Sequence, residues 1–265
     1  MHPMVNIAVR AARAAGRVIT QHIDRLDRVA VQSKGRNDFV SDVDRMAEQA
    51  IVDTLHDAYP DHAILGEEGG AQGESDYCWI IDPLDGTTNY LHAFPHYAVS
   101  IGLTHRDQLE CGVVYDPLRQ ELFTARRGNG AQLDGRRIRV SQRKALSGSL
   151  LGTGFPFRKQ EHLPAYVDMF RDVCIHSSDL RRAGSAALDL AYVACGRLDG
   201  FWEIGLSPWD MAAGALLVRE AGGIVTDFGG DADYLKTGNI VAGGLKVHNA
   251  LLQTIKPHKT AELAR

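Results

Sequence analysis

The chain has 265 residues, of which 45% are hydrophobic and 23% are charged, and its formal net charge is -4. This composition is ordinary for a folded enzyme and excludes the disordered and fibrous classes of protein. The nearly balanced charge gives no support to a strongly basic nucleic-acid-binding protein. We expect a single domain over residues 1–265, built from two closely packed halves that meet near residues 145–150.

The first 23 residues predict an amphipathic helix of the mature protein rather than a secretion signal. Apolar residues recur there at helical spacing, whereas Arg10, Arg13 and Arg17 interrupt every apolar stretch. No apolar run in the chain approaches the roughly 20 residues that a membrane-spanning helix needs. The four cysteines have no metal-type spacing. We therefore expect free thiols in a reducing compartment and a cytoplasmic protein.

The next part of the chain predicts a helix followed by short strands. Residues 32–38 form a polar segment, and a second helix is expected from Ser41, which has the spacing of a capping box with Asp44. Pro60 should end that helix. Two alternating runs joined by a short polar turn indicate a hairpin at 97–104 and 109–115. The other strands of this half are expected at 63–66, 77–82, 121–125 and 137–140.

Helices alternate with strands in the second half. Gly196 is a suitable residue to follow the end of a helix at about 184–195, and Pro208 suits the first turn of a later helix. Mixed elements in this order favour a layered α/β or α+β enzyme. The remaining elements are expected as a strand at 150–154, a helix at 163–173, strands at 198–204, 224–227 and 240–242, and a final helix.

The strongest chemical signal is the run Asp-Pro-Leu-Asp-Gly-Thr-Thr-Asn at residues 82–89. It follows an apolar strand, so Asp82 and Asp85 should emerge at a strand end, where ligand sites of such sheets lie. Both carboxylates can converge on one hard cation, and Gly86 allows backbone N–H groups to approach a phosphate. The alternative interpretation is a simple turn, because Asp-Pro and Asp-Gly are common turn dipeptides.

Two further acidic features belong with this run. Glu67-Glu68 follows a short strand, and Asp210 lies near the start of an apolar helix. Read singly, the first is typical of a solvated loop and the second of a helix cap. Together, Glu67, Asp82, Asp85 and Asp210 form an all-oxygen set, which favours Mg²⁺, Mn²⁺ or Ca²⁺ over zinc. Such a set can hold two cations that act on phosphorus.

Other residues were considered for chemistry and set aside. His92 and His96 flank the motif, but no nucleophile pairs with them, and we interpret them as structural. The arginine pairs at 126–127, 136–137 and 181–182 are more typical of solvated or interface positions than of a nucleic-acid surface. No phosphate-binding P-loop, hydrolase nucleophile elbow or zinc-protease motif is present.

With these three acidic elements in order, the whole chain resembles the inositol monophosphatase family. It is most similar to the bacterial branch, some members of which also serve in ribosomal RNA transcription antitermination and ribosome biogenesis. The resemblance implies a layered αβαβα sandwich, a homodimer and a lithium-sensitive hydrolase with two to three Mg²⁺ ions. It implies that a metal-activated water hydrolyses inositol 1-phosphate. RNA polymerase and its antitermination complex are the implied partners.

The resemblance also assigns roles to individual residues. Glu67, Asp82 and the carbonyl of Leu84 match the ligands of the first Mg²⁺, and Glu67 matches a ligand of a weaker third. Asp82, Asp85 and Asp210 match the ligands of the second. The remaining roles are orientation of the attacking water by Glu67, Thr87 and Asp44, phosphate binding by the N–H groups of Gly86 and Thr87, and substrate contacts from Asp85, Asp210, Ala186 and Glu203.

Substrate choice is less defined than metal chemistry. Residues 205–208 are Gly-Leu-Ser-Pro, where the animal enzymes carry other pocket side chains. Related phosphatases for fructose bisphosphate, 3′-phosphoadenosine phosphate, NADP or histidinol phosphate share the metal motifs, so only the region of Glu203 and Ala186 favours inositol. A transcription-complex component with incidental phosphatase activity is the second alternative.

Overall fold

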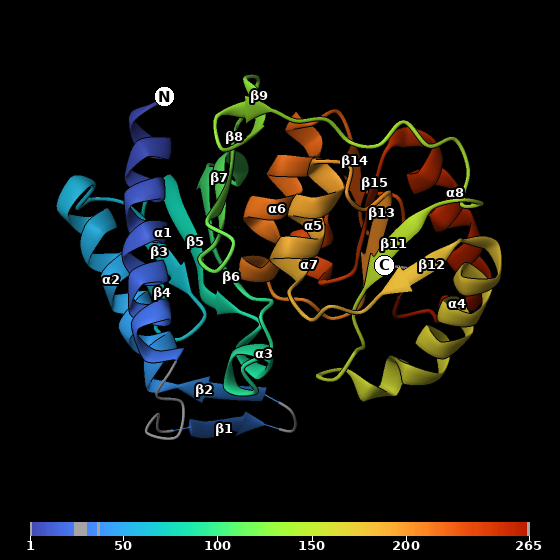
Figure 1. Ribbon diagram of the computed structural model, residues 1–265, viewed down its shortest axis with the longest axis horizontal. Coiled ribbons are helices and arrows are strands. Elements are labelled where there is room, and N and C mark those ends of the chain that lie inside the picture. Colours follow the sequence, from blue (N-terminus) through green and yellow to red (C-terminus); the bar gives the residue numbers. More distant parts are fainter. Residues whose placement is uncertain (1, 24–30, 36–37, 264–265) are drawn as a thin grey trace.

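The structure, a computed structural model, describes residues 2–23, 31–35 and 38–263, with the backbone alone at 31–35 and 38–40. Helical layers alternate with two β-sheets, giving an αβαβα sandwich (Figure 1). The layered fold implied by the resemblance is therefore confirmed. No helix among the described residues is long and apolar enough to cross a membrane.

The larger sheet comes from the first half of the chain. Its strand order is β10-β9-β8-β7-β6-β5-β3-β4, and only the β3–β5 pair is parallel. The expected hairpin is confirmed as β6 and β7. The strands are β3 (Ala63–Gly66), β4 (Gly70–Gln72), β5 (Tyr77–Asp85), β6 (Ala98–His105), β7 (Gln108–Asp116), β8 (Glu121–Arg126), β9 (Gly130–Leu133) and β10 (Arg136–Arg137).

Helices α1 (Pro3–His22) and α2 (Asp42–Ala58) cover the outer face of the larger sheet (Figure 1). The apolar side of α1 is buried, as its periodicity predicted. The capping box at the start of α2 is confirmed: the Asp44 carboxylate accepts a hydrogen bond from the Ser41 N–H. Before α2, strands β1 (Val31–Gly35) and β2 (Asp38–Ser41) form an antiparallel pair.

The smaller sheet comes from the second half and has the order β12-β11-β13-β15-β14. Strand β11 is parallel to both of its neighbours, β12 and β13. Helices α4 (Leu163–His176) and α8 (Leu245–Ile255) cover the outer face of the smaller sheet (Figure 1). The strands are β11 (Leu150–Thr153), β12 (Asp179–Arg181), β13 (Gly200–Glu203), β14 (Ile224–Thr226) and β15 (Ile240–Gly243).

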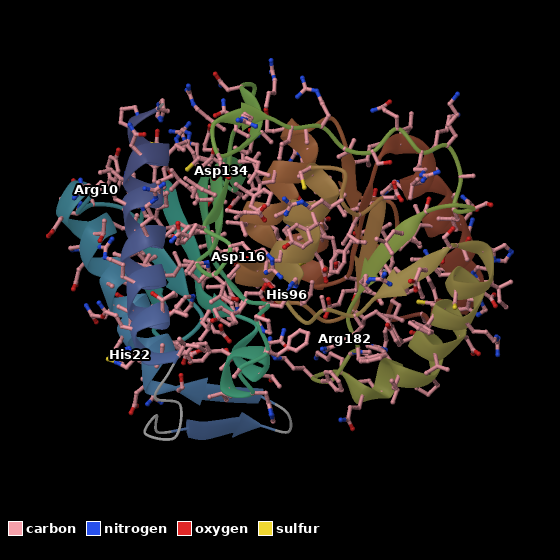
Figure 2. The ribbon with its side chains drawn as sticks, in the orientation of Figure 1. Arg10, His22, His96, Asp116, Asp134 and Arg182 are labelled. Carbon is pink, nitrogen blue, oxygen red and sulfur yellow. The ribbon has the colours of Figure 1, made fainter. Side chains whose placement is uncertain are left out.

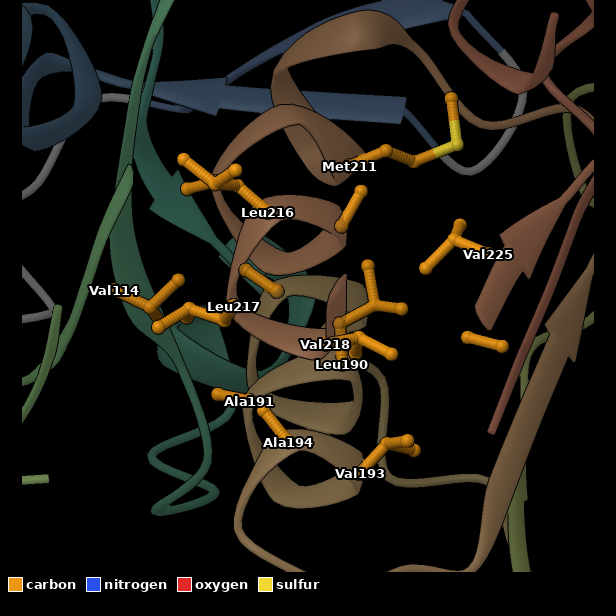
Figure 3. Close-up of a cluster of buried hydrophobic side chains, with 14 of the residues drawn as sticks. Val114, Leu190, Ala191, Val193, Ala194, Met211, Leu216, Leu217, Val218 and Val225 are labelled. Carbon is orange, nitrogen blue, oxygen red and sulfur yellow. The ribbon is translucent and has the colours of Figure 1, made fainter. Parts of the chain in front are cut away.

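Helices α5 (Ala186–Ala194) and α6 (Pro208–Glu220) form the middle layer between the two sheets. A helix that is apolar all round must be buried on all sides, and residues 211–218 of α6 are buried without exception. Figure 3 shows how side chains such as Leu190 and Leu217 fill this layer, with Val114 of the larger sheet and Val225 of the smaller sheet facing them. The middle layer is therefore one core shared by both sheets.

Several elements differ from the sequence-based expectations. The expected strand at 137–140 is wrong beyond Arg137, because Ile138 bonds to Ala131 as an isolated contact rather than extending a ladder. Six short elements lack a clear periodicity and were not predicted: the paired strands β1 and β2 at the expected polar segment, β4, β12, α3 (Thr87–Leu91) and α7 (Tyr234–Thr237). Two 3₁₀ turns lie at Gln160–His162 and Lys256–His258.

The close approach of α6 to β7 generates a stability prediction. A Cβ atom at Gly112 would lie 2.8 Å from the backbone oxygen of Ala213 and 3.0 Å from its Cα. Because the obstacle is helix backbone, Gly112→Ala should lower the free energy of unfolding by about 1–3 kcal/mol, the usual cost of overpacking. Urea denaturation measures this change. An unchanged midpoint would show that α6 moves away from β7 without cost.

Candidate active site

The end of β5 brings Asp82 and Asp85 to the same side of the larger sheet. Residues three apart on a regular strand point to opposite faces. Here Asp82 pairs with Ser100 and Asp85 with Ala98, so β5 holds one extra residue between the two pairs. Such a bulge re-aims side chains. As a result, one carboxylate oxygen from each of Asp82, Asp85 and Asp210 lies within 4.8 Å of the other two.

Asp85 is held by the start of α5. Its Oδ2 accepts hydrogen bonds from the Ser185 hydroxyl and the Ala187 N–H, both at 2.7 Å. Ser185 is the residue before the helix, where side-chain oxygens also cap free N–H groups. The carboxylate therefore reaches from the larger sheet to the first turn of a middle-layer helix.

Backbone donors fix the other two aspartates. Asp82 Oδ1 accepts from the Leu84 N–H at 2.9 Å, within the irregular last part of β5. Asp210 Oδ2 accepts from the Ser207 N–H at 2.7 Å, as part of a capping box at the start of α6. The helix-cap interpretation of Asp210 is thus correct, and it coexists with a place in the cluster.

The cluster has a strong excess of buried negative charge. Burial raises the pKa of Asp82 well above the ordinary carboxyl value, and the charges of Glu67, Asp85 and Asp210 raise it further. Burial also raises the pKa of Asp85 to about 6, although its hydrogen bonds oppose the shift. Burial followed by the charge of Asp85 raises the pKa of Asp210 to about 6. An all-oxygen set under this repulsion fits a hard divalent cation such as Mg²⁺.

Glu67 reaches the same cavity but lies outside the cluster of three. Its Oε1 is 3.7 Å from Nη2 of Arg158, whose Nη1 is 3.9 Å from Asp210 Oδ2. Arg158 was missed in the sequence, because it comes from an irregular segment between β11 and α4 that no motif marks. The role of Glu67 as a metal ligand stays a prediction.

Asp44 serves two partners at once. Its Oδ2 accepts from Ser41, and its Oδ1 lies 2.8 Å from the Thr87 hydroxyl, which is also 3.0 Å from the Leu84 carbonyl. Burial raises the pKa of Asp44, and the hydrogen bonds from Ser41 and Thr87 oppose that shift. A hydroxyl has one proton to donate, so Thr87 donates to either Asp44 or the Leu84 carbonyl at a given time. The helix cap and the Asp44–Thr87 pair are compatible, because they use different oxygens of Asp44.

Gly86 adopts a left-handed backbone conformation that turns the chain into α3. Its φ is 102°, and a Cβ atom there would lie 3.0 Å from the His96 carbonyl oxygen and 3.2 Å from that of Gly184. Only glycine suits this position. The N–H groups at the start of a helix have no intrahelical acceptor, so the backbone from Gly86 onward presents donors beside the carboxylates. The phosphate-binding role of Gly86 and Thr87 stays a prediction.

The cluster of three aspartates lines a cavity of about 530 Å³ together with Glu67, Leu84, Gly86 and Thr87, and Asp44 contacts this lining through Thr87. Ala186 and Glu203, the expected substrate contacts, line it together with Asp189 and Arg182, which the motifs did not indicate. Figure 2 shows Arg182 between α3 and the segment that leads to α4. Asp189 had a detectable signal, because it is the single charged residue of α5, an otherwise nearly apolar helix. Gly205 and Leu206, from the segment that departs from the animal enzymes, also line the cavity.

The two motif-flanking histidines lie in different surroundings. His92 is exposed and lines the cavity. His96, labelled in Figure 2, is buried, and burial together with the nearby Arg119 lowers its pKa to about 4, so the ring is neutral at neutral pH. The structural interpretation agrees with the burial of His96, whereas for His92 it stays a prediction.

The amino-acid sequence of the chain matches a known protein family. The family model described as the inositol monophosphatase family matches residues 1–260. A Pseudomonas aeruginosa protein named Nus factor SuhB is 58% identical over 271 residues, and the match covers 100% of both chains.

Solved structures give the same relationship. The crystal structure of the extragenic suppressor protein suhB from Bartonella henselae is 44% identical, with a TM-score of 0.94 over 96% of this chain and 99% of that chain. The structure of inositol monophosphatase from Anabaena is 39% identical, with a TM-score of 0.85 over 96% of this chain and 95% of that chain.

The buried charge at the cluster generates a prediction about Asp85→Asn. The amide oxygen can still accept from Ser185 and Ala187, while one repelling charge is removed. Without metal, the variant should therefore unfold at the same temperature as the wild type or higher. Millimolar Mg²⁺ should stabilise the wild type, as any ligand of the folded state does, and should stabilise the variant much less.

Thermal unfolding with and without Mg²⁺ measures both effects. Asp57→Asn, which removes the same charge from an exposed position on α2, is the matched control and should behave like the wild type. An equal Mg²⁺-induced shift in Asp85→Asn would exclude Asp85 as a ligand. Early unfolding of the metal-free variant would instead indicate a mainly structural role.

Proposed function

Because the chain belongs to the inositol monophosphatase family, we propose that it is a Mg²⁺-dependent phosphatase that hydrolyses inositol 1-phosphate to inositol and phosphate. The observation that carries the proposal is the cluster of Asp82, Asp85 and Asp210, whose oxygens lie within 4.8 Å of one another in a 530 Å³ cavity. Buried carboxylates that repel one another are costly, and divalent cations are what such groups ordinarily hold.

In the proposed mechanism, the metal ligands are Glu67, Asp82, Asp85, Asp210 and the carbonyl of Leu84. Mg²⁺, when bound there, supplies positive charge that stabilises the phosphoryl oxygens and the leaving alkoxide and makes water more acidic. The cluster lies at the end of β5 and the start of α6, so rigid elements set its geometry. The other residues of the site then bind the substrate and orient the attacking water.

The chain's own groups act on the water and the phosphate. Asp44 accepts a hydrogen bond from the Thr87 hydroxyl, which leaves the lone pairs of Thr87 free to accept a hydrogen bond from the attacking water. Glu67 assists in orienting that water. The N–H groups of Gly86 and Thr87 donate to phosphate oxygens. These hydrogen bonds stabilise the negative charge on the phosphoryl group while the bond between phosphorus and the inositol oxygen breaks. Ala186 and Glu203 contact the inositol ring.

A phosphate-release panel tests the proposal. With Mg²⁺, the wild type should hydrolyse inositol 1-phosphate in preference to fructose bisphosphate, 3′-phosphoadenosine phosphate, NADP and histidinol phosphate. Chelator should abolish activity while the protein stays folded, and Li⁺ should inhibit. Asp85→Asn should lower kcat by at least about 10²-fold, the scale of one lost electrostatic element, and it also controls for contaminating phosphatase. Full activity in excess chelator would contradict the metal-dependent mechanism.

A second role is supported by the relatives named Nus factor SuhB, which are similar over the full length of the chain. We propose that this chain also takes part in transcription antitermination of ribosomal RNA, with RNA polymerase and the antitermination complex as partners. As the resemblance implies, we propose a cytoplasmic homodimer. The carboxylates of the phosphatase site are buried, whereas docking to a large complex uses exposed surface. Mutation should therefore separate the two roles.

The separation prediction uses the same Asp85→Asn variant. It should lose phosphatase activity yet still recover RNA polymerase and antitermination factors in a pull-down, because its outer surface is unchanged. Wild type and Asp57→Asn serve as positive controls. Loss of binding by a folded Asp85→Asn variant would indicate that the site or its metal-ordered loops belong to the contact surface. Recovery of no transcription partner by the wild type would overturn the second role.

A further inference from the structure

The cavity contains two more carboxylates, Asp189 and Glu203, beside Gly152 and Gly154, the glycines on either side of Thr153. A Cβ atom at Gly154 would lie 2.0 Å from Glu203 Oε1, and one at Gly152 would lie 3.4 Å from Asp189 Cγ. Residues two apart in an extended chain share a face. The two carboxylates therefore approach the same face of this segment, where the absence of a Cβ at Gly154 makes room for Glu203.

Strand pairing supports this placement. In the parallel pair β11–β13, Thr153 is opposite Trp202. The next position along both strands places Gly154 beside Glu203. Asp189 approaches from α5, in the middle layer that covers this face of the smaller sheet. Glu203 and Asp189 thus come from a strand and a helix respectively, so both are held by rigid elements.

Among the described residues, no hydrogen-bond donor to the Asp189 carboxylate explains its burial. It is 2% exposed and lines the cavity. Within the described part of the chain, neither a hydrogen bond nor an ion pair to its carboxylate is found, although its backbone N–H bonds to Ser185 within the helix. A buried carboxylate without a donor costs substantial free energy. Aimed at a cavity, such a group is ready to accept hydrogen bonds from a ligand.

The charge around the pair selects the kind of ligand. Arg182 is the cation whose charge acts on both carboxylates, and its guanidinium stacks over Phe155 and Phe157 at 5.2 Å and 4.9 Å from the ring centroids. One positive charge faces two carboxylates, so a second phosphate group is disfavoured here. Neutral hydroxyl groups, by contrast, donate readily to carboxylate oxygens.

We propose that Asp189 is a specificity-determining residue that, together with Glu203, accepts hydrogen bonds from two hydroxyl groups of a polyol phosphate. This inference rests on the proposed phosphatase function and adds Asp189 to the residues that select its substrate. The phosphate lies at the cluster of Asp82, Asp85 and Asp210, and the polyol lies in the part of the same cavity that Asp189 and Glu203 line. Monophosphates of hydroxyl-rich rings fit this arrangement, whereas bisphosphates and phosphates of apolar alcohols do not.

Steady-state kinetics of Asp189→Ala with two substrates test the inference. The KM for inositol 1-phosphate should rise about 10-fold or more, the scale of a lost hydrogen bond to a charged group, with a smaller change in kcat. For phenyl phosphate, which has no hydroxyl to donate, the rise in KM should be several-fold smaller. Asp189→Asn keeps one acceptor oxygen and should have an intermediate effect. Asp57→Ala is the charge-loss control.

A second route to the same result is Gly154→Ala, whose methyl group would occupy the place of the Glu203 carboxylate. It should also raise the KM for inositol 1-phosphate selectively, and it keeps the inference testable if Asp189→Ala does not fold. Equal losses on both substrates in the folded variants would overturn the inference, because they would indicate a general structural role for Asp189.

A binding measurement separates this inference from the proposed function. Calorimetric titration of inositol 1-phosphate into the Ca²⁺-loaded wild type and Asp189→Ala requires no turnover. Weaker binding by the variant supports the polyol contact even if no phosphate is released from any substrate, which would overturn the phosphatase proposal alone. Equal affinities, or no binding by the wild type, would overturn the role of Asp189.

Discussion

The hydrogen bonds that Asp85 accepts from the start of α5 tie the candidate site to the architecture of the whole molecule. Asp85 ends a strand of the larger sheet, and α5 lies between the two sheets. A negative charge is also favoured at a helix N-terminus. Because one oxygen holds Ser185 and Ala187, the spacing between the sheet and the middle layer sets where the other oxygen meets Asp82 and Asp210. We propose on the same ground that the two halves behave as one domain.

Much of the layered fold was predictable because its signals are local. The apolar run of α6 predicts burial on all sides, and the alternation of β6 and β7 predicts their hairpin. The aspartates were found because each follows or begins a recognisable element. By contrast, the bulge that aligns Asp82 with Asp85 depends on pairing with β6. The position of Arg158 depends on packing between segments far apart in sequence, which no local pattern records. Asp189 is conspicuous as the single charge of α5, but the local pattern does not indicate the cavity that it faces.

Stability and chemistry oppose each other at this site. Burying several carboxylates around one cavity weakens the folded protein, and backbone donors at Leu84 and Ser207 offset only part of that cost. The surrounding layers supply the rest of the required stability through apolar packing, as the shared core of α5, α6 and both sheets illustrates. The folded protein therefore tolerates the acidic cavity because a large, well-packed sandwich surrounds it, which helps to explain why so much chain surrounds so small a site.

The guanidinium of Arg158, 3.7 Å from Glu67 and 3.9 Å from Asp210, has a consequence for how the site is filled. The guanidinium lies beside two carboxylates that the proposed function assigns to the metal, so it offsets part of their repulsion without an inorganic ion. Under that proposal, cation uptake would be an ion exchange, in which the arriving ion displaces an arginine of the irregular segment between β11 and α4. The rate of loading would then depend on the movement of that segment as well as on diffusion of the ion.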